Sequence, residues 1–251
     1  MVRSVTVCVV SIKATDSLQR LDAPWRAPAN LGLQYMRVLI TAGPTYEPID
    51  PVRFIGNHST GKMGYALAEA FAGAGAAVML VSGPTNLADP AHPNIKTVRV
   101  DTADQMYAAA AAAAPSTDIW VFAAAVADYK PREVAITKIK KEGDTLTLEL
   151  VKNVDIAATL GRTKRATQFS VGFALETNNE EVNAREKLAR KHFDLIVLNS
   201  LRDPGAGFRH DTNKVTLLEA DGQMTIFELK PKAAVAEDIV RTILARLPHH
   251  A

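Results

Sequence analysis

From Arg37 to the C-terminus, short apolar runs alternate with longer segments whose apolar residues recur at helical spacing. Apolar runs bounded by glycine, proline or polar residues predict buried strands, and the longer periodic segments predict helices. In the first half we predict strands at residues 38–41, 77–81, 95–100 and 118–123. Helices are predicted at residues 61–73 and 102–114, and the second ends in consecutive alanines that suit close packing on a sheet.

The pattern changes after residue 130. Residues 130–142 are polar and predict a loop, whereas residues 145–151 alternate as a strand does. Further strands are predicted at residues 168–174 and 194–199, with a short helix capped by residues 152–155, a helix at 180–191 and a turn at 205–208. Two last strands, 214–219 and 224–229, predict a hairpin around Asp221-Gly222, and residues 232–247 predict a closing helix.

Strands that alternate with helices indicate an α/β fold with a doubly wound, mostly parallel sheet, ended here by a β-hairpin and a closing helix. In such sheets, ligands bind beside the carboxyl ends of the strands. The loops that follow the strands at residues 38–41, 118–123 and 168–174 are therefore the candidate site.

Residues 1–35 differ from the remainder because they keep no sustained period and contain Pro24 and Pro28. Met36 stands directly before the first predicted strand. We expect residues 1–35 to be an N-terminal extension outside the core, and residues 36–251 to form the functional domain. An ordered arm that packs on the domain is the alternative.

The composition is useful mainly because it excludes several classes of protein. With 47% hydrophobic residues among 251, the chain can bury one full core, and its formal net charge of +2 predicts no nucleic-acid partner. The single cysteine, Cys8, excludes an internal disulfide framework. No apolar run approaches the roughly 18 residues of a membrane span, so we predict no membrane partner and a cytoplasmic location.

The most informative segment is residues 37–64, RVLITAGPTYEPIDPVRFIGNHSTGKMG. A strand that feeds a polar loop and then a helix is how α/β proteins build phosphate sites, because backbone N–H groups and the helix dipole face the ligand. Residues 56–62 fit the spacing of a P-loop, yet Met63 replaces the hydroxyl residue that binds magnesium, and the strand ends too early. A G-x-G-x-x-G dinucleotide fingerprint is absent as well.

Polar side chains in these loops are candidates for chemistry. The Asn57 amide could stabilise a developing oxyanion or simply cap a turn. Arg53 could hold a carboxylate or a phosphate, or lie on the surface as an ordinary charge. Residues 138–141, KIKK, suit either a flap that closes over phosphates or a solvated charged face.

The second half of the chain adds three further candidates. Lys187 and Lys191 stand four residues apart on one predicted helix and so project from one face, where they are either surface charges or ligand contacts. Asp128 follows a strand, where it could bond a base or a sugar, or cap the next turn. Histidine and cysteine do not cluster at metal-ligand spacing.

Taken together, these motifs resemble those of phosphopantothenoylcysteine synthetase (phosphopantothenate–cysteine ligase) of the bacterial CTP-dependent type. The resemblance covers about residues 37–247 and runs, in the family's order, through AGPTYEPIDPVRFIGNHSTGKMG, AAAVADY, KIKK, KNVD and GFALETN. It implies a Rossmann-like fold, a homodimer, and the joining of 4'-phosphopantothenate to L-cysteine with CTP and Mg2+ in coenzyme A biosynthesis. The carboxylate would attack the α-phosphate to give an acyl-cytidylate and pyrophosphate, and the cysteine amine would then displace CMP.

The resemblance also implies roles by position. Asn57 matches the asparagine that binds substrate and turns over the acyl-cytidylate, Arg53 matches a substrate-binding arginine, and Lys138 matches a catalytic flap lysine. The implied nucleotide contacts are Phe122, Ala123, Ala124, Asp128, Lys138, Lys152, Asn153, Val154, Asp155, Phe173, Lys187 and Lys191. Val154 departs from the family pattern, which has proline there, so this loop lacks a fixed φ.

Many bacterial members of that family carry a flavin-dependent decarboxylase before the synthetase, and residues 1–35 are too few to encode one. The resemblance therefore implies a stand-alone synthetase.

Two alternatives remain open on the sequence alone. An NAD(P)-dependent reductase would share the fold, although its fingerprint is missing, and a non-catalytic nucleotide-binding regulator would bind CTP without turnover.

Overall fold

The computed structural model describes residues 36–141, 143–176, 178–200 and 210–247. Its centre is an eight-stranded sheet built from β1 (Arg37–Ala42), β4 (Ala77–Ser82), β5 (Ile95–Arg99), β6 (Ile119–Phe122), β9 (Phe169–Glu176), β10 (Leu195–Ser200), β11 (Thr212–Glu219) and β12 (Met224–Pro231). The spatial order is β12-β11-β10-β9-β6-β1-β4-β5, with parallel pairing from β10 to β5 and antiparallel pairing of β11 with both β10 and β12. The predicted mostly parallel sheet and C-terminal hairpin are confirmed.

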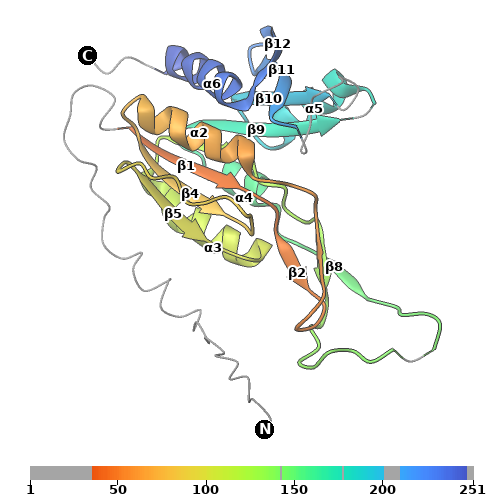
Figure 1. The fold of residues 1–251 in the computed structure, drawn as a ribbon. Helices are drawn as coiled ribbons and strands as arrows, with labels where there is room; N and C mark the ends of the chain where they lie inside the picture. The colour runs from red at the N-terminus through yellow and green to blue at the C-terminus, as the bar shows by residue number, and fades with distance from the viewer. Residues whose placement is uncertain (1–35, 142, 177, 201–209, 248–251) are drawn as a thin grey trace.

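Helices cover both faces of this sheet (Figure 1). On one face, α2 (Lys62–Gly73) and the closing helix α6 (Lys232–Arg246) pack together and against the central strands. The other face carries α3 (Ala103–Ala113), followed by a 3-10 turn at Ala114–Ser116, with α4 (Ile156–Gly161) and α5 (Glu180–Arg190). Two hydrophobic cores result, one on each side of the sheet, as a doubly wound fold requires.

The alanine run packs on the sheet as predicted. Ala109, Ala110 and Ala113 are buried in the same core as Trp120 of β6. The helix begins at a capping box, in which the Thr102 hydroxyl accepts from the Gln105 N–H and the Gln105 side chain accepts from the Thr102 N–H. Small side chains let α3 lie close to its strands.

Two small antiparallel sheets project from the body (Figure 1). One pairs β2 (Tyr46–Pro48) with β3 (Phe54–Gly56), and the other pairs β7 (Tyr129–Pro131) with β8 (Leu150–Lys152). We call residues 46–56, 129–141 and 143–152 the arm. Ala135 N–H donates to the Ile49 carbonyl, which joins the two halves of the arm.

The strand predicted at residues 145–151 is wrong over most of its length, because the observed strand begins only at Leu150. The alternation there has no core to face, since Leu146 is 56% exposed and Leu150 is 42% exposed. Pairing is limited to the three residues that β7 offers, and the last two residues of β7 fall in the segment predicted as a loop.

The remaining predicted elements match the structure to within a few residues, including the short helix α4 and the closing helix α6. Residues 1–35 and the turn predicted at residues 205–208 lie outside the described residues. Within the part of the chain that the structure describes, no helix is long and apolar enough to cross a bilayer.

Candidate functional site

A cleft of about 810 Å³ lies at the point where the strand order reverses. From β1 the chain proceeds through β4 and β5 on one side, whereas β6, β9 and β10 extend the sheet on the other. Open α/β sheets bind ligands in the crevice beyond such a point. Thr41 of β1, Phe122 of β6 and Phe173 of β9 line the cleft, and its volume is within the range of small-molecule sites.

The loops after β1 and β6 are joined to each other at the mouth of this crevice. The Ala125 N–H donates to the Gly43 carbonyl at 2.8 Å, and the Ala127 N–H donates to the fully buried Thr45 hydroxyl at 3.0 Å. These bonds, one to a backbone carbonyl and one to a buried hydroxyl, hold the AAAVADY segment along the cleft.

The N-terminus of α2 opens into the cleft. Gly61, its N-cap, has φ +75°, and its first turn has neither an acidic residue nor a capping side chain among the described residues. A Cβ on Gly64 would lie 2.5 Å from the Ala42 Cβ, so glycine is what allows the helix to begin this close to β1. Backbone N–H groups and the helix dipole therefore favour an anion here.

One end of the cleft is built by β8 and α4. The Asn153 side chain donates to the Ala127 carbonyl at 2.8 Å, and its backbone N–H donates to the Asp128 carbonyl at 2.9 Å. Its Oδ1 is buried and has no hydrogen-bond partner in the described chain. A buried acceptor without a partner is costly, so this atom is available to accept a hydrogen bond from a molecule bound in the cleft.

Asp155 caps α4, as predicted for the segment 152–155. Its carboxylate accepts from the Ala158 N–H at 3.0 Å and from the Lys191 ammonium at 3.0 Å. Burial raises the pKa of the Asp155 carboxyl, but the Ala158 N–H and Lys191 outweigh that effect, and the pKa lies below its ordinary value. The loop is thus held by the cap and the ion pair, although Val154 replaces the family's proline.

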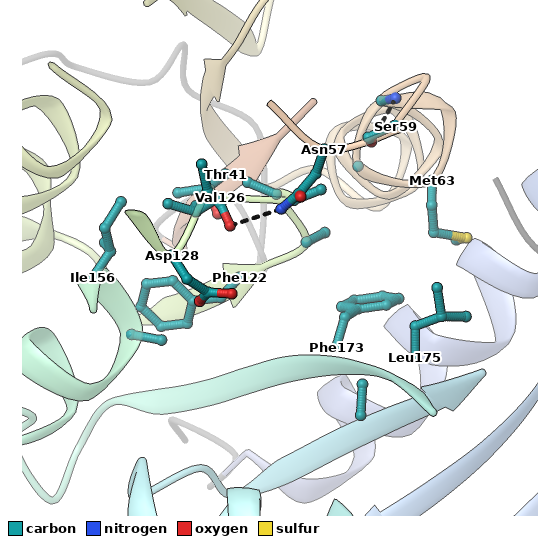
Figure 2. Close-up of a pocket in the computed structure, with 18 of the residues that line it drawn as sticks. Thr41, Asn57, Ser59, Met63, Phe122, Val126, Asp128, Ile156, Phe173 and Leu175 are labelled. Atoms are coloured by element: carbon teal, nitrogen blue, oxygen red, sulfur yellow. Dashed lines mark hydrogen bonds between the residues drawn. The ribbon is translucent and has the colours of Figure 1, made fainter. Parts of the chain in front are cut away.

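Aromatic rings and two lysines form the floor near β9. The Phe122 and Phe193 ring centroids are 5.8 Å apart, and Lys187 donates to the Phe173 carbonyl at 2.8 Å. Lys187 and Lys191 both line the cleft, as expected of side chains four residues apart on one helix face. Figure 2 shows Phe122 and Phe173 on one side of the cleft and Asn57 on the other.

Asn57 lines the cleft from the loop that precedes α2. Its Nδ2 donates to the Val126 carbonyl at 3.0 Å (Figure 2), which fixes which end of the amide faces the AAAVADY segment. The side chain is exposed to the cleft and caps no helix, since Gly61 is the N-cap of α2. Its position suits a polar contact with a bound substrate.

The candidate site residues fall into two groups. Lining the cleft are the candidates Asn57, Phe122, Ala123, Ala124, Asp128, Lys152, Asn153, Val154, Asp155, Phe173, Lys187 and Lys191. Among the described residues that form this lining, Arg53 and Lys138 are absent. Both lie on the arm. They could therefore contact a bound ligand only if the arm moved toward the cleft of its own subunit or lay beside the cleft of a second copy.

Arg53 instead anchors the lysine-rich segment. Its guanidinium donates from Nε to the buried Asp50 carboxylate at 2.9 Å and from Nη2 to the Ile139 carbonyl at 2.9 Å. The Ile139 N–H completes the clip by donating to Asp50 at 3.2 Å. Arg53 holds the pKa of the Asp50 carboxyl well below its usual range, against the opposing effect of burial. Lys138 and Lys140, which flank Ile139, are exposed.

Sequence reasoning missed one end of the cleft. Asn199 of β10, Asn213 of β11 and Lys232 of α6 line it, and Lys62 was noted only for its P-loop spacing. Asn199 lies near the carboxyl end of its strand, which was an available signal. Asn213 is the second residue of β11 and Lys232 is the first residue of α6, and only the sheet order brings them to the cleft.

A doubly wound sheet with a cleft at the point where its strand order reverses defines a Rossmann-like α/β domain. More particularly, the chain belongs to the family described as DNA/pantothenate metabolism flavoprotein C-terminal domain, which matches residues 33–247. The family resemblance predicted from the sequence is confirmed.

Curated relatives agree with this membership. The coenzyme A biosynthesis bifunctional protein CoaBC of Vibrio vulnificus (strain YJ016) is 46% identical over 219 residues, covering 86% of this chain and 54% of that protein. A protein named cysteine/cysteine sulfinic acid decarboxylase, from an unknown prokaryotic organism, is 50% identical over 208 residues, covering 83% of this chain and 58% of its own. The chain therefore spans about half the length of the curated relatives it matches.

Solved structures support the same fold. The crystal structure of the C-terminal domain of CoaBC matches with a TM-score of 0.72 at 43% identity, over 84% of this chain and 95% of that one. The DNA/pantothenate metabolism flavoprotein from Streptococcus pneumoniae matches with a TM-score of 0.72 at 25% identity, over 84% and 99% of the two chains. The Rossmann-like fold predicted from the sequence is thereby confirmed.

Proposed function

We propose that this chain is a ligase of coenzyme A biosynthesis that joins 4'-phosphopantothenate and L-cysteine with CTP. The names and identity of the CoaBC relatives support the pathway. The observation that carries the proposal is that one cleft is lined by three features that suit these substrates. They are Asn57, the N-terminus of α2 and the buried acceptor of Asn153. That arrangement offers an anion site, a base-reading atom and an amide for acyl chemistry.

The proposed reaction has two steps. The phosphopantothenate carboxylate attacks the α-phosphorus of CTP, the bond to the bridging oxygen breaks, and pyrophosphate leaves with the electron pair. The cysteine amine then adds to the acyl carbon, and CMP leaves as the amide forms. Activation is required because a carboxylate resists amines until it carries a good leaving group, and cations lower the cost of the growing phosphate charge.

The chain's own groups fit these steps. The N–H groups at the start of α2 suit a phosphate, and Lys138 would add a cation when the arm closes. Among the residues that the structure describes, no group of three or more His, Cys, Asp or Glu could hold a metal. We therefore propose that Mg2+ enters on the triphosphate oxygens, where a hard cation retaining water ligands would neutralise phosphate charge.

Pyrophosphate release tests the function directly. We expect release that depends on both phosphopantothenate and CTP, with continuous turnover only when cysteine is present. The proposal would be falsified if the protein bound CTP but released no pyrophosphate with phosphopantothenate, which is the behaviour of a regulator. Oxidation of NAD(P)H by the protein in the absence of any nucleotide triphosphate would favour a reductase instead.

The base is read, in this proposal, by Asn153. Its unpaired Oδ1 can accept a hydrogen bond from the exocyclic amine of cytosine. The position of the loop determines the size of the base whose amine can reach this atom. We expect Asn153→Ala to lower kcat/KM for CTP by about 10–100-fold, the cost of one buried hydrogen bond. Steady-state pyrophosphate release with CTP and ATP gives both constants.

Asn94→Ala, outside the cleft, is the matched control and should retain the wild-type preference for CTP. Equal kcat/KM values for ATP and CTP in the wild-type protein would contradict the choice of CTP. A loss in Asn153→Ala no larger than in the control would show that another group reads the base.

We also propose that the protein is a homodimer that associates through the arm. Large apolar side chains gather there, with Ile136 at 93%, Val52 at 61%, Phe54 at 51% and Val134 at 51% exposure. An apolar surface of this kind marks an interaction site in most proteins, and a second copy of the chain is the partner the family resemblance implies.

Light scattering should then give about twice the chain mass of 27.1 kDa. Ile136→Asp buries a charge in the proposed interface, so we expect it to shift the protein toward the monomer at micromolar concentration. Val182→Asp is the control, because Val182 is 59% exposed on α5, outside the arm. A monomeric wild-type protein, or equal dissociation in the two variants, would rule out the arm as the interface.

A further inference from the structure

The buried carboxylate of Asp50 has no part in the steps proposed above. Asp50 lies in the turn between β2 and β3, and it is only 3% exposed although the arm projects from the body of the protein (Figure 1). A buried charge is costly unless a cation and N–H donors surround it. The bonds that Asp50 makes therefore indicate its role.

The two carboxylate oxygens of Asp50 bind different parts of the arm. Oδ1 accepts from the backbone N–H groups of Val52 and Arg53, each at 2.9 Å, and so shapes the turn to which Asp50 itself belongs. Oδ2 accepts from Arg53 Nε at 2.9 Å and from the Ile139 N–H at 3.2 Å. Ile139 stands 89 residues later in the chain, so Oδ2 joins the turn to the lysine-rich segment, residues 138–141.

Ile139 is held through both of its backbone polar groups. Its N–H donates to Asp50, and its carbonyl accepts from Arg53 Nη2 at 2.9 Å. That N–H belongs to the peptide unit shared with Lys138, and that carbonyl belongs to the peptide unit shared with Lys140. Because peptide units are planar, the two side chains fix the backbone on both sides of Ile139, and with it the points from which the two lysines extend.

The lysine-rich segment has little other support. The described residues 132–141 form no helix and no strand, and they contribute to neither hydrophobic core. The Ala135 N–H bond to the Ile49 carbonyl anchors the start of this loop, whereas the bonds from Asp50 and Arg53 anchor its lysines. A segment with few packed side chains opens easily, so its order depends on these few bonds.

We propose that Asp50 is a positioning residue, which fixes the backbone beside Lys138 and so determines where that ammonium is presented to a reacting phosphate. The role of Lys138 rests on the proposed function, whereas the ordering of residues 138–141 by Asp50 rests on the clip alone. Asp50 touches no substrate and acts through Ile139. Arg53 shares this role, because its Nη2 holds the second peptide unit.

The clip has a consequence for the rate of activation. A long lysine side chain reaches a defined point only when its backbone is held, and a cation that is already in place loses less freedom during the reaction. Displacing such a group by about 1 Å can cost about 10²-fold in rate. Loss of Asp50 should therefore lower kcat for activation more than it raises KM for CTP.

The Asp50→Asn variant cuts the long-range link selectively. Asparagine keeps the shape of the side chain, and its oxygen can still accept from the two N–H groups of the turn. Its amide nitrogen then takes the place of Oδ2 and presents N–H groups to the donors of Arg53 and Ile139. Asp144→Asn is the matched control, because it removes the same charge from an exposed position of the arm.

Limited proteolysis with trypsin tests the ordering without turnover, because Lys138, Lys140 and Lys141 are themselves cleavage sites. We expect Asp50→Asn to speed cleavage after these lysines by about 10–100-fold, the range for loss of one charge-assisted hydrogen bond. Mass spectrometry of the fragments gives the rate at each site, and thermal unfolding shows whether the main sheet stays folded. Asp144→Asn should be cleaved at the wild-type rate.

A double-mutant cycle tests whether Asp50 acts through Lys138. Rapid-quench measurement of acyl-cytidylate formation should show a loss of about 10–100-fold in Asp50→Asn. Adding Asp50→Asn to Lys138→Gln should then cost less than about twofold more, because the positioned group is already gone. A residue that only stabilised the fold, or that contacted substrate itself, would give losses that multiply.

Should Asp50→Asn fail to fold, Arg53→Lys carries the test, because it keeps the cation but not the fork that reaches both Asp50 and the Ile139 carbonyl. Cleavage of residues 138–141 at the wild-type rate in a folded variant would overturn the proposal, and so would multiplicative losses in the cycle. A wild-type protein that forms no acyl-cytidylate would refute the proposed function. Faster cleavage in Asp50→Asn would even then show that Asp50 orders the segment.

Discussion

The Asn57→Asp variant is expected to release about one equivalent of pyrophosphate when mixed with phosphopantothenate, CTP and cysteine, and then to stall. Activation needs cations around a phosphate, whereas amide formation needs a donor at an acyl carbon that becomes tetrahedral. Aspartate keeps the size of Asn57 but replaces its N–H donors with negative charge. Losing one oxyanion donor costs about 10²–10³ in rate, and a like charge adds to that cost.

The structure sharpens this expectation. Asn57 Nδ2 donates to the Val126 carbonyl at 3.0 Å, and a carboxylate cannot make that bond. The aspartate will be repelled by the carbonyl oxygen and pushed toward the ligand space, where it opposes the developing oxyanion. The nucleotide-contact candidates at Asn153 and Asp155 are untouched, so CTP affinity should stay near that of the wild type.

Mass spectrometry of the bound species decides the assignment of Asn57. An accumulated acyl-cytidylate places the side chain in the second step, and Asn94→Asp, outside the cleft, should turn over normally. If phosphopantothenate remains unreacted and no intermediate forms, Asn57 serves substrate binding or activation instead.

Lys138→Gln should be far more damaging than Lys141→Gln, although both lysines are exposed on the arm. A cation that reaches the reacting phosphate stabilises charge that grows toward the transition state, so its loss lowers kcat more than it raises KM. We expect kcat to fall by about 10²–10³ for Lys138→Gln, comparable to the removal of other transition-state donors, and by less than about threefold for Lys141→Gln.

Rapid-quench measurement of acyl-cytidylate formation separates activation from later steps in both variants. Small and similar effects would mean that residues 138–141 are only a solvated charged face.

Mixed dimers of Asn57→Asp and Lys138→Gln subunits add a second readout. They regain activity only if the arm of one subunit delivers Lys138 to the cleft of the other.

The central strands of the main sheet were predictable because they are buried on both faces. Val38, Leu39 and Ile40 are fully buried, and such continuous apolar runs are unmistakable in a sequence. The arm was not predictable for the converse reason. Its strands are only three residues long, so neither Tyr46–Pro48 nor Tyr129–Pro131 leaves a periodic signal.

The candidate site was predictable where it follows strand ends and resembles known motifs. The residues at the ends of β6 and β9 line the cleft as that logic requires. Lys232 could not be found this way, because the first residue of a closing helix has no local feature that separates a ligand contact from a surface charge. Arg53 shows the opposite difficulty, since its clip to Asp50 and Ile139 depends on the folded arm.

The position of β1 in the middle of the sheet also governs how the chain is made. β1 pairs with β4 on one side and with β6 on the other, where Val38 lies opposite Ile119. Because β6 comes after β4 and β5 in the sequence, the second edge of β1 is paired last. During translation the partial sheet of β1, β4 and β5 therefore leaves the ribosome with an unpaired apolar edge, a template for association between nascent chains. That edge is covered only once residues 119–122 of β6 have been made and pair with β1.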